Sequence, residues 1–390
     1  MIRTLTYKYS APGKVILSGE HSVVYGMPCI AFTVNVRTNV EINLKAARAI
    51  SNKLIVNLID FNTSFDYSWD QTLLTKRNSI DVIKNMQEGR PFDTMIEVVK
   101  KIAYDSMPLP KEENLAKIAQ ILRDNYETTI TIESQIPFNS GMGSSASISV
   151  ALSAVLLQFF NTLCLKTLGK SSELFGSKDE FANCVNTYSL FGEKLIHGSP
   201  SGVDNCAIIR GGIINYTKLS DGGSYEKISE KPNFLFCIIN SNTKRFTSDI
   251  IKKVRSIKEC FPKLFNSLIS SIKQCTISML EIVKKPILSQ IDEDKLMSLV
   301  KINHKMLSSL LITHPNLEKV INICEKHGIP AKLTGAGLGG SVVGLVKRSD
   351  FEKDCGMLDV LKDDLQKNGY SLITTMSDNI GMHEEISLVE

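Results

Sequence analysis

The sequence has little excess of either charge, and its cysteines lack the pairing that a metal site or a disulfide framework requires. Among 390 residues, 45 are basic and 41 are acidic, so the formal net charge is only +4. This near balance gives no electrostatic case for binding nucleic acid or a membrane, and we expect a small-molecule partner. The nine cysteines are scattered and never form a C-x-x-C pair. They are interpreted as buried thiols in a reducing compartment.

Signals for export and for membrane insertion are also missing. Residues 1–9 lack the apolar core of a secretory signal. No stretch approaches the roughly twenty apolar residues that a membrane span requires, so a cytoplasmic location is expected. Apart from His21, the histidines show no metal-ligand spacing and are interpreted as structural or surface residues.

The length of the chain predicts two domains, because one hydrophobic core seldom grows to 390 residues. Short apolar runs broken by glycine and proline at residues 7–17 and 29–44 predict strands, so we expect the N-terminal part of the chain to form a sheet. From 248 to 327 the pattern is mainly helical, including helices over 294–311 and 317–327. We place the domain boundary near residue 228, after a glycine-rich loop.

A glycine loop between a strand and a helix is the strongest local signal. Residues 128–136 alternate as a half-buried strand does, and 144–163 form an apolar run typical of a buried helix. Between them lies Pro137-Phe-Asn-Ser-Gly-Met-Gly-Ser-Ser-Ala146. Its glycines let backbone N–H groups approach phosphate oxygens, and the helix N-terminus adds positive potential. No lysine follows the glycines, so this is not a Walker A loop. A phosphate cradle is favoured over a dinucleotide turn and over a turn that serves only helix packing.

A second glycine run, 335–340, lies between predicted strands over 332–334 and 341–346. Because a strand follows the glycines where a dinucleotide turn needs a helix, that interpretation fails here too. A flexible turn remains an alternative for this run.

Two acidic residues, Glu193 and Asp204, are candidates for functional carboxylates. A helix is predicted over 181–197, and Glu193 lies in its last turn, where the helix dipole disfavours negative charge. A bound cation would compensate that charge, and a solvated surface glutamate is the alternative. Asp204 precedes a predicted hairpin whose strands, 207–209 and 213–216, flank two glycines. It is either a turn aspartate or a base held at a strand entrance.

A third polar cluster interrupts the first strand-like segment. Lys14 follows Ala-Pro-Gly, and Glu20-His21 follow Gly19. An ordinary edge-strand lysine is the alternative for Lys14.

Taken together, residues 10–26, 137–146 and 332–340 resemble the three motifs of the GHMP kinases. Within that family, the first segment and residues 193–205 are most similar to the mevalonate kinase branch. The resemblance implies an α+β fold with a ribosomal-protein-S5-like N-terminal domain over 1–228, which contains a left-handed βαβ unit. A C-terminal domain over 229–371 would be an antiparallel sheet covered by helices, and residues 372–390 would return to the first domain.

The resemblance also implies an activity, its cofactors and its residues. The reaction would transfer the γ-phosphate of ATP to the 5-hydroxyl of (R)-mevalonate, with Mg²⁺ held by Ser145 and Glu193. Asp204 would take the proton of the hydroxyl, and Lys14 would stabilise the carboxylate and the developing charge. ATP contacts would come from Lys14, Asn62, Trp69, Ser134, Asn139, Ser140, Gly141, Met142, Gly143, Ser144 and Ser145. Mevalonate contacts would come from Glu20, His21, Asp204, Thr247, Thr334 and Gly335. A homodimer is implied as well.

The sequence departs from the family pattern in two places. Leu338 replaces a glycine usual in the third motif, and we expect a negative φ at this residue, because leucine adopts a positive φ only with strain. The segment 240–247 is shorter than in the family. Other members, such as phosphomevalonate kinase or galactokinase, and a kinase-like sensor without turnover are the alternatives. The presence of Lys14, Ser145, Glu193 and Asp204 argues against the sensor.

Overall fold

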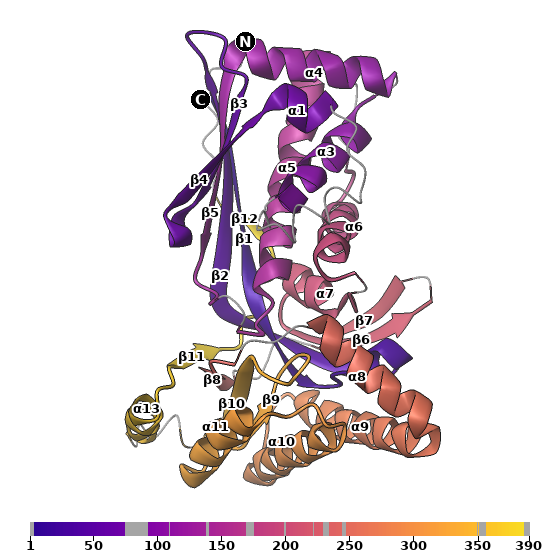
Figure 1. The fold of residues 1–390 in the computed structure, drawn as a ribbon, viewed down its shortest axis with the longest axis vertical. Coiled ribbons are helices and arrows are strands. Elements are labelled where there is room, and N and C mark those ends of the chain that lie inside the picture. Colours follow the sequence, from indigo (N-terminus) through magenta and orange to yellow (C-terminus); the bar gives the residue numbers. More distant parts are fainter. Residues whose placement is uncertain are drawn as a thin grey trace.

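The chain folds into two α/β parts stacked along the long axis of the molecule, as the computed structural model shows (Figure 1). Each part has its own sheet, and the long first strands run from the upper part into the lower one. The structure describes residues 4–74, 93–108, 110–137, 140–168, 175–198, 200–220, 222–228, 234–243, 247–348, 350 and 356–385.

The first sheet is built on two long antiparallel strands, β1 (Thr4–Ser18) and β2 (Pro28–Ala46). The strand order is β12-β1-β2-β5-β3-β4, and β6 pairs with β2 and β7 beside this path. The pairing of β3 with β5 is parallel, and helices form the crossover between them. The other strands span β3 (Lys53–Leu58), β4 (Thr63–Ser68), β5 (Tyr126–Ser134), β6 (Ile213–Leu219), β7 (Gly222–Ile228) and β12 (His383–Glu385).

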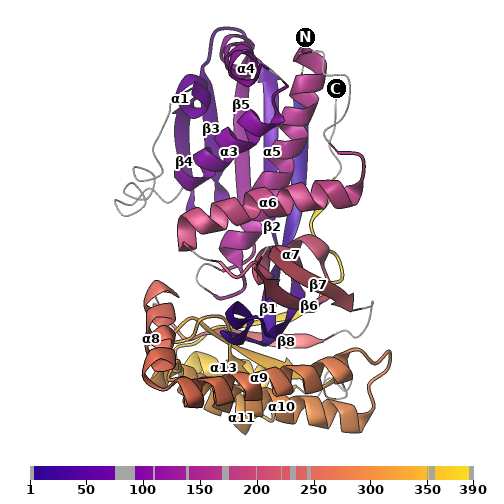
Figure 2. The same ribbon diagram turned by 90° about the vertical axis from the view of Figure 1, so that its right-hand side faces the viewer.

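Helices cover one face of this sheet (Figure 2). Their centre is α5 (Ser144–Leu168), which packs on β1 and β2 and whose side chains are mostly buried. Around it lie α1 (Trp69–Leu74), α3 (Asp93–Ser106), α4 (Lys111–Asn125), α6 (Lys178–His197) and α7 (Val203–Arg210). Two short 3₁₀ helices, η1 (Ser22–Tyr25) and η2 (Ile59–Phe61), follow β1 and β3.

The expectation that no stretch is apolar enough for a membrane span was wrong for α5. By length and composition this helix passes that criterion. In the structure, however, 78% of its most apolar window is buried inside the protein. Its apolar character is explained by its place at the centre of a domain, where all sides of a helix meet other side chains.

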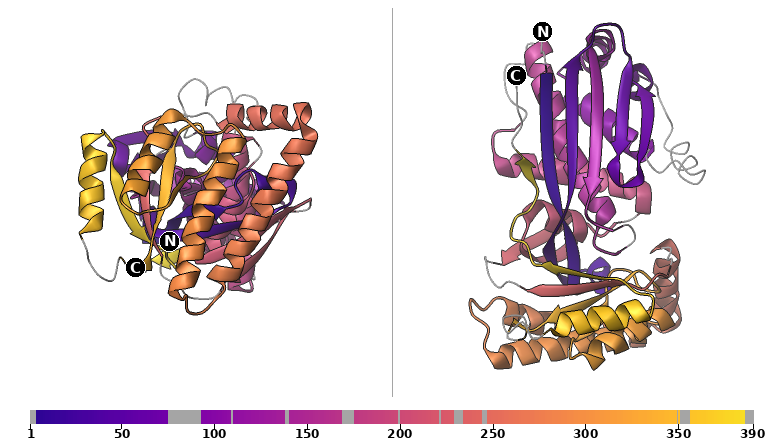
Figure 3. Two further views of the ribbon diagram at one scale, coloured as in Figure 1. Left: turned by 90° about the horizontal axis from the view of Figure 1, so that it is seen from below. Right: turned by 90° about the vertical axis from the view of Figure 1, so that its left-hand side faces the viewer.

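The second sheet is antiparallel, with the order β11-β8-β10-β9. Its strands are β8 (Leu235–Asn240), β9 (Ala331–Leu333), β10 (Ser341–Val346) and β11 (Leu372–Met376). Seen from below, long helices lie across it (Figure 3). These are α8 (Thr247–Cys260), α9 (Pro262–Val283), α10 (Gln290–Ser309), α11 (Pro315–Lys326) and α13 (Met357–Lys367). The predictions of a mainly helical region and of strands on both sides of the second glycine run are confirmed.

A shared apolar cluster joins the two sheets. Val15 and Phe32 of the first sheet belong to the same buried cluster as Phe236 and Leu345 of the second. Residue 228, where the domain boundary is predicted, is the last residue of β7, and the second sheet begins with β8. The return of the chain starts later than residue 372, because β11 pairs with β8 in the second sheet. Ser377 then forms an isolated bridge to Val34 of β2, and β12 pairs with β1 close to the start of the chain (Figure 3).

The hairpin predicted around residues 210–212 was wrong. Residues 203–210 form α7, in which Val203, Ala207 and Ile208 are buried at helical spacing. The actual hairpin follows it and joins β6 to β7. A short apolar run such as 206–209 fits a strand and a buried helix equally well, so periodicity alone did not distinguish them.

Candidate active site

The first glycine loop is bound to β1 through Lys14. The Lys14 backbone N–H donates to Met142 O at 2.9 Å, and its ammonium donates to Gly141 O at 3.2 Å. Gly143 has a φ of 74°, and a Cβ there would lie 3.0 Å from Lys14 Cε. A glycine is therefore required where the loop meets the lysine.

The loop leads directly into the N-terminus of α5, which begins at Ser144. The Ser144 hydroxyl is buried and has no hydrogen-bond partner among the residues that the structure describes. A helix N-terminus with an unpaired hydroxyl and a glycine backbone suits an anion, because it offers donors and positive potential together.

Lys14 also forms an ion pair that joins β1 to α7. Its Nζ lies 3.1 Å from Asp204 Oδ2. The lysine side chain is only 3% exposed, whereas that of Asp204 is 31% exposed. Asp204 stands in the first turn of α7 and not at a strand entrance, and there the helix dipole stabilises its carboxylate. The pair thus has one buried cation and one carboxylate that a small molecule can reach.

Glu193 is a buried residue, so the interpretation as a solvated surface glutamate is excluded. Its side chain accepts hydrogen bonds from Ser145 Oγ at 3.3 Å and Ser149 Oγ at 3.4 Å, both in the first turns of α5. The positive end of α5 thus faces this carboxylate, which offsets its unfavourable place near the end of α6. Burial, and then the negative charge of Asp204, raises the pKa of Glu193 to about 7.

These oxygen atoms are the kind of ligand that a hard cation prefers. Ser145 Oγ and Glu193 Oε2 lie together, and His197 Nε2 is 3.3 Å from the same hydroxyl. In the described part of the chain, no three His, Cys, Asp or Glu side chains gather into a metal site. The arrangement therefore fits a cation that arrives with its other ligands already bound, and not one held by the protein alone.

The third cluster meets the second glycine loop at the junction of the two sheets. Glu20 forms an ion pair with Lys332 of β9, and both side chains are fully buried. His21 has a φ of 59°, and its Nε2 lies 2.9 Å from Ala336 O. Burial lowers the pKa of His21. The structure thus brings Glu20 and His21 to the loop that begins with Thr334 and Gly335.

Lys332 is the residue of this cluster to which sequence reasoning assigned no role. Its signal in the sequence is a single charged residue within the buried strand Ala331–Leu333. A lysine is almost never fully buried without a partner, so its position predicts one. The identity of that partner depends on contacts across 312 residues, which the sequence pattern does not contain.

Trp69, predicted as a nucleotide contact, does not reach the site. It is completely buried in the core of the first domain, where its indole N–H donates to Thr128 Oγ1 at 3.3 Å. The nucleotide assignment of Trp69 is therefore corrected to a core residue. A large apolar side chain at the start of the short helix α1 is most stable when packed between α3, α4 and the sheet.

Other predicted contacts lie at the edge of the site or outside the described residues. Asn62 is exposed, with a φ of 47°, at the end of η2. Asp60 of the same turn accepts a 2.7 Å hydrogen bond from the N–H of Ser134, so Asn62 and Ser134 lie at the same end of the sheet. Asn139 lies outside the described residues, and for Thr247 the structure describes only the backbone, at the start of α8.

The expectation of a negative φ at Leu338 was wrong, because φ is 50°. The Leu338 N–H donates to Ile312 O at 2.6 Å, and its side chain packs on the core of the second domain. On the other side of the loop, the Gly340 N–H donates to Thr243 O at 3.1 Å. The loop is thus held from both sides, and these contacts maintain a backbone conformation that leucine alone disfavours.

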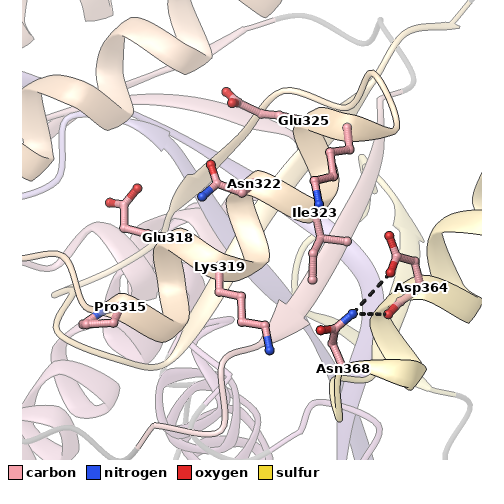
Figure 4. A pocket seen from close by; sticks show the side chains of 9 residues that line it. Pro315, Glu318, Lys319, Asn322, Ile323, Glu325, Asp364 and Asn368 are labelled. Atoms are coloured by element: carbon pink, nitrogen blue, oxygen red, sulfur yellow. Dashed lines mark hydrogen bonds between the residues drawn. The ribbon is translucent and has the colours of Figure 1, made fainter.

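A separate groove lies on the second domain between α11 and α13 (Figure 4). Its volume is about 860 Å³, and its walls mix both charges with amide groups. None of the predicted site residues lines it, so it is not the candidate active site. The lining residues are Pro315, Glu318, Lys319, Asn322, Ile323, Glu325, Lys326, Asp364 and Asn368.

Comparisons with known proteins identify the family of this chain. The family described as GHMP kinases N terminal domain matches residues 113–212, and the one described as GHMP kinases C terminal matches residues 285–354. Mevalonate kinase from Bos taurus is 30% identical over 360 residues, which cover 88% of this chain and 86% of that relative.

Solved structures of similar proteins share the fold. Mevalonate kinase from Methanococcus jannaschii has a TM-score of 0.70 at 24% identity, over 95% of this chain and 98% of its own. Mevalonate kinase from L. major, solved in complex with R-mevalonate, has a TM-score of 0.67 at 21% identity, over 96% of each chain. With its sequence similarity to the bovine enzyme and its two matched domains, the chain belongs to the mevalonate kinase branch of the GHMP kinase family.

Proposed function

We propose that this protein, an ATP-dependent small-molecule kinase by its family, transfers the γ-phosphate of ATP to the 5-hydroxyl of (R)-mevalonate. The product would be 5-phosphomevalonate. The observation that carries the proposal is the 3.1 Å pair of Lys14 and Asp204 beside the glycine loop at the start of α5. The names of the similar proteins, and the mevalonate in the L. major complex, support the choice of acceptor.

Asp204 is the base in this proposal. Its carboxylate is partly exposed, so the hydroxyl of an acceptor can reach it. It takes up the hydroxyl proton as the oxygen attacks the γ-phosphorus atom of ATP, and the bond from that phosphorus to the β,γ-bridging oxygen breaks to release ADP. Lys14 keeps the carboxylate oriented and stabilises negative charge that develops on the transferred group. In phosphoryl transfer, positioning and charge neutralisation provide most of the acceleration.

The glycine loop and the first turn of α5 bind the phosphates of ATP. Backbone N–H groups of Gly141, Gly143, Ser144 and Ser145 serve as donors, since those of Ser140 and Met142 are bonded within the loop. The unpaired Ser144 hydroxyl offers another donor. Asn62 and Ser134, at one end of the sheet, remain proposed nucleotide contacts, and so does Asn139.

Ser145 and Glu193 would hold Mg²⁺. A hydroxyl and a carboxylate suit this cation, which usually takes one or two protein ligands and completes its shell with phosphate oxygens and water. When bound, Mg²⁺ neutralises negative charge on the phosphate oxygens. A neighbouring cation also favours the ionised form of Glu193, which burial alone disfavours.

The acceptor lies on the side of Glu20 and His21, against the second glycine loop with Thr334 and Gly335. Thr247, at the start of α8, is proposed to contact it as well. The homodimer and the cytoplasmic location stay predictions.

An assay of ADP release over four acceptors tests the proposed function. With ATP and Mg²⁺, mevalonate should give turnover, whereas phosphomevalonate, galactose and homoserine should give little. Preference for another acceptor would overturn the substrate assignment. Binding of ATP and mevalonate without ADP release would instead show a sensor that lacks catalysis.

A further inference from the structure

One buried ammonium group joins the two sheets at the acceptor side of the site. Lys332, on β9 of the second sheet, forms an ion pair with Glu20 and donates to Ile16 O of β1 at 3.3 Å. The Lys332 side chain has no exposed surface, and that of Glu20 is 1% exposed. Lys332 thus makes both of these polar contacts with the first domain, although its strand belongs to the second.

The second oxygen of the Glu20 carboxylate accepts no hydrogen bond from the described residues. Glu20 Oε2 is buried and has no hydrogen-bond partner among the described residues, whereas Oε1 is bound to Lys332. A buried carboxylate oxygen without a donor is costly, and such an atom usually marks a missing water or ligand. Apolar side chains of similar volume often join two domains at least as stably as a buried ion pair does.

The Glu20–Lys332 pair lies close to the Lys14–Asp204 pair. Cys29 of β2 is fully buried, and a Cβ on Gly19 would lie 2.6 Å from its Cα. Burial raises the pKa of the Cys29 thiol, the charges of Glu20 and Asp204 raise it further, and Lys14 and Lys332 oppose this. All four charges act on this thiol. Lys332 binds the carbonyl of Ile16, two residues after Lys14 on β1, so the two pairs lie near each other along this strand.

The residues around Glu20 also face the acceptor side. His21 contacts the carbonyl of Ala336 in the second glycine loop. Thr334 follows Lys332 by two residues, so both belong to the same face of their strand and its extension. Glu20, His21 and Lys332 thus meet at the loop that is proposed above to bind the acceptor.

We propose that Lys332 is a positioning residue for the acceptor: it holds the Glu20 side chain in an orientation in which Oε2 accepts a hydrogen bond from an acceptor hydroxyl. This inference rests on the proposed function, because it takes a hydroxylated acceptor to bind here. Lys332 acts through Glu20 and does not touch the acceptor itself. Since the lysine comes from the second sheet, acceptor binding requires that the two domains are docked.

A double-mutant cycle tests this role. Glu20→Met, Lys332→Met and the double variant are compared with the parent in KM for mevalonate, KM for ATP and thermal midpoint. Each single change should raise the KM for mevalonate at least tenfold and leave the KM for ATP within twofold. Because Lys332 acts through Glu20, the double variant should be no worse than the more affected single variant. Additive effects of the two changes would overturn the proposal.

The same variants distinguish an effect of the Glu20–Lys332 pair on protein stability from an effect on acceptor binding. A single change leaves one buried charge unpaired, whereas the double variant leaves none and should fold even if a single variant does not. A double variant with a parental KM for mevalonate would show a purely structural pair and overturn the proposal. Lys332→Arg, which keeps the charge, should recover much of the loss seen in Lys332→Met.

Leu361→Ala is the matched control, because it removes packing from the buried core of the second domain without touching a polar group. It should lower the thermal midpoint and leave both KM values unchanged. If the parent phosphorylates another acceptor but not mevalonate, the proposed function fails. The cycle is then measured with that acceptor, so the two failures are distinguishable.

Discussion

Lys14 Nζ lies 3.1 Å from Asp204 Oδ2 and 3.2 Å from the carbonyl oxygen of Gly141. The lysine thus links the carboxylate of α7 to the glycine loop before α5. Because its side chain is buried, its ammonium has little freedom to leave this position. The proposed base and the proposed phosphate cradle thus share one fixed cation, which maintains the separation that an in-line transfer requires.

Asp204→Asn should lower kcat by roughly two to four orders of magnitude, the usual effect of losing a general base. Asparagine keeps the size of the side chain and one acceptor oxygen, but it takes up no proton at neutral pH. ATP affinity should barely change, because Asp204 is not among the residues proposed to bind ATP. Steady-state kinetics with mevalonate and calorimetry with nucleotide measure both quantities.

Asp204→Ala shows how much of that loss comes from misplacement of Lys14, since it removes the acceptor oxygen as well. Turnover within tenfold of the parent would refute the base assignment of Asp204. Loss of ATP binding or of the folded state would instead favour a structural role.

Without magnesium, the free energy of unfolding of the Glu193→Gln variant should depend less on pH than that of the parent. Burial raises the pKa of Glu193 to about 7, so the folded protein holds a proton that the unfolded chain has released above about pH 4.5. The parent therefore loses stability, on the order of 3 kcal/mol, as pH rises from about 4.5 to 7. Glutamine does not titrate, so its thermal midpoint should change less between pH 5 and pH 8. Melting curves with a chelator measure this.

The same variant tests the proposed metal ligand. Glu193→Gln should need far more magnesium for turnover than the parent, or should lose turnover altogether. An unchanged magnesium dependence would rule out Glu193 as a ligand. A variant that is unfolded at pH 5, where the parent carboxyl is mostly protonated and resembles glutamine, would show that the side chain is needed for folding.

Trp69→Phe should lower stability by about 1–3 kcal/mol, because it removes packing and the hydrogen bond to Thr128 from a buried site. The KM for ATP should stay within twofold of the parent. Asn62→Gly is the matched comparison, since glycine accepts the positive φ of that residue while losing its side chain. It should raise the KM for ATP with little change in melting. A raised KM for ATP in a fully stable Trp69→Phe variant would restore the nucleotide assignment.

The sequence predicted what depends on local chemistry. Glycines before an apolar run predicted the loop that leads into α5, and a carboxylate near a helix end indicated that Glu193 has an unusual environment. What it missed depends on distant contacts. The burial of Trp69 needs helices that are remote in sequence, and the partner of Lys332 lies in the other sheet. Residues 206–209 were ambiguous because a short apolar run has no distinct period.

Leu338 provides the last test, because its positive φ was not expected from its side chain. A leucine at a φ of 50° is strained by about 1–2 kcal/mol, whereas glycine is not. Leu338→Gly and Leu338→Ala both lose the packing of the leucine on the second domain. Alanine keeps the strain, so Leu338→Gly should be the more stable of the two by about 1 kcal/mol, although glycine has the larger entropy in the unfolded chain. Chemical denaturation of the two variants measures the difference. If Leu338→Ala proved more stable than Leu338→Gly, the loop in solution would use a negative φ at this residue, and the hydrogen bond from its N–H to Ile312 would have to be absent.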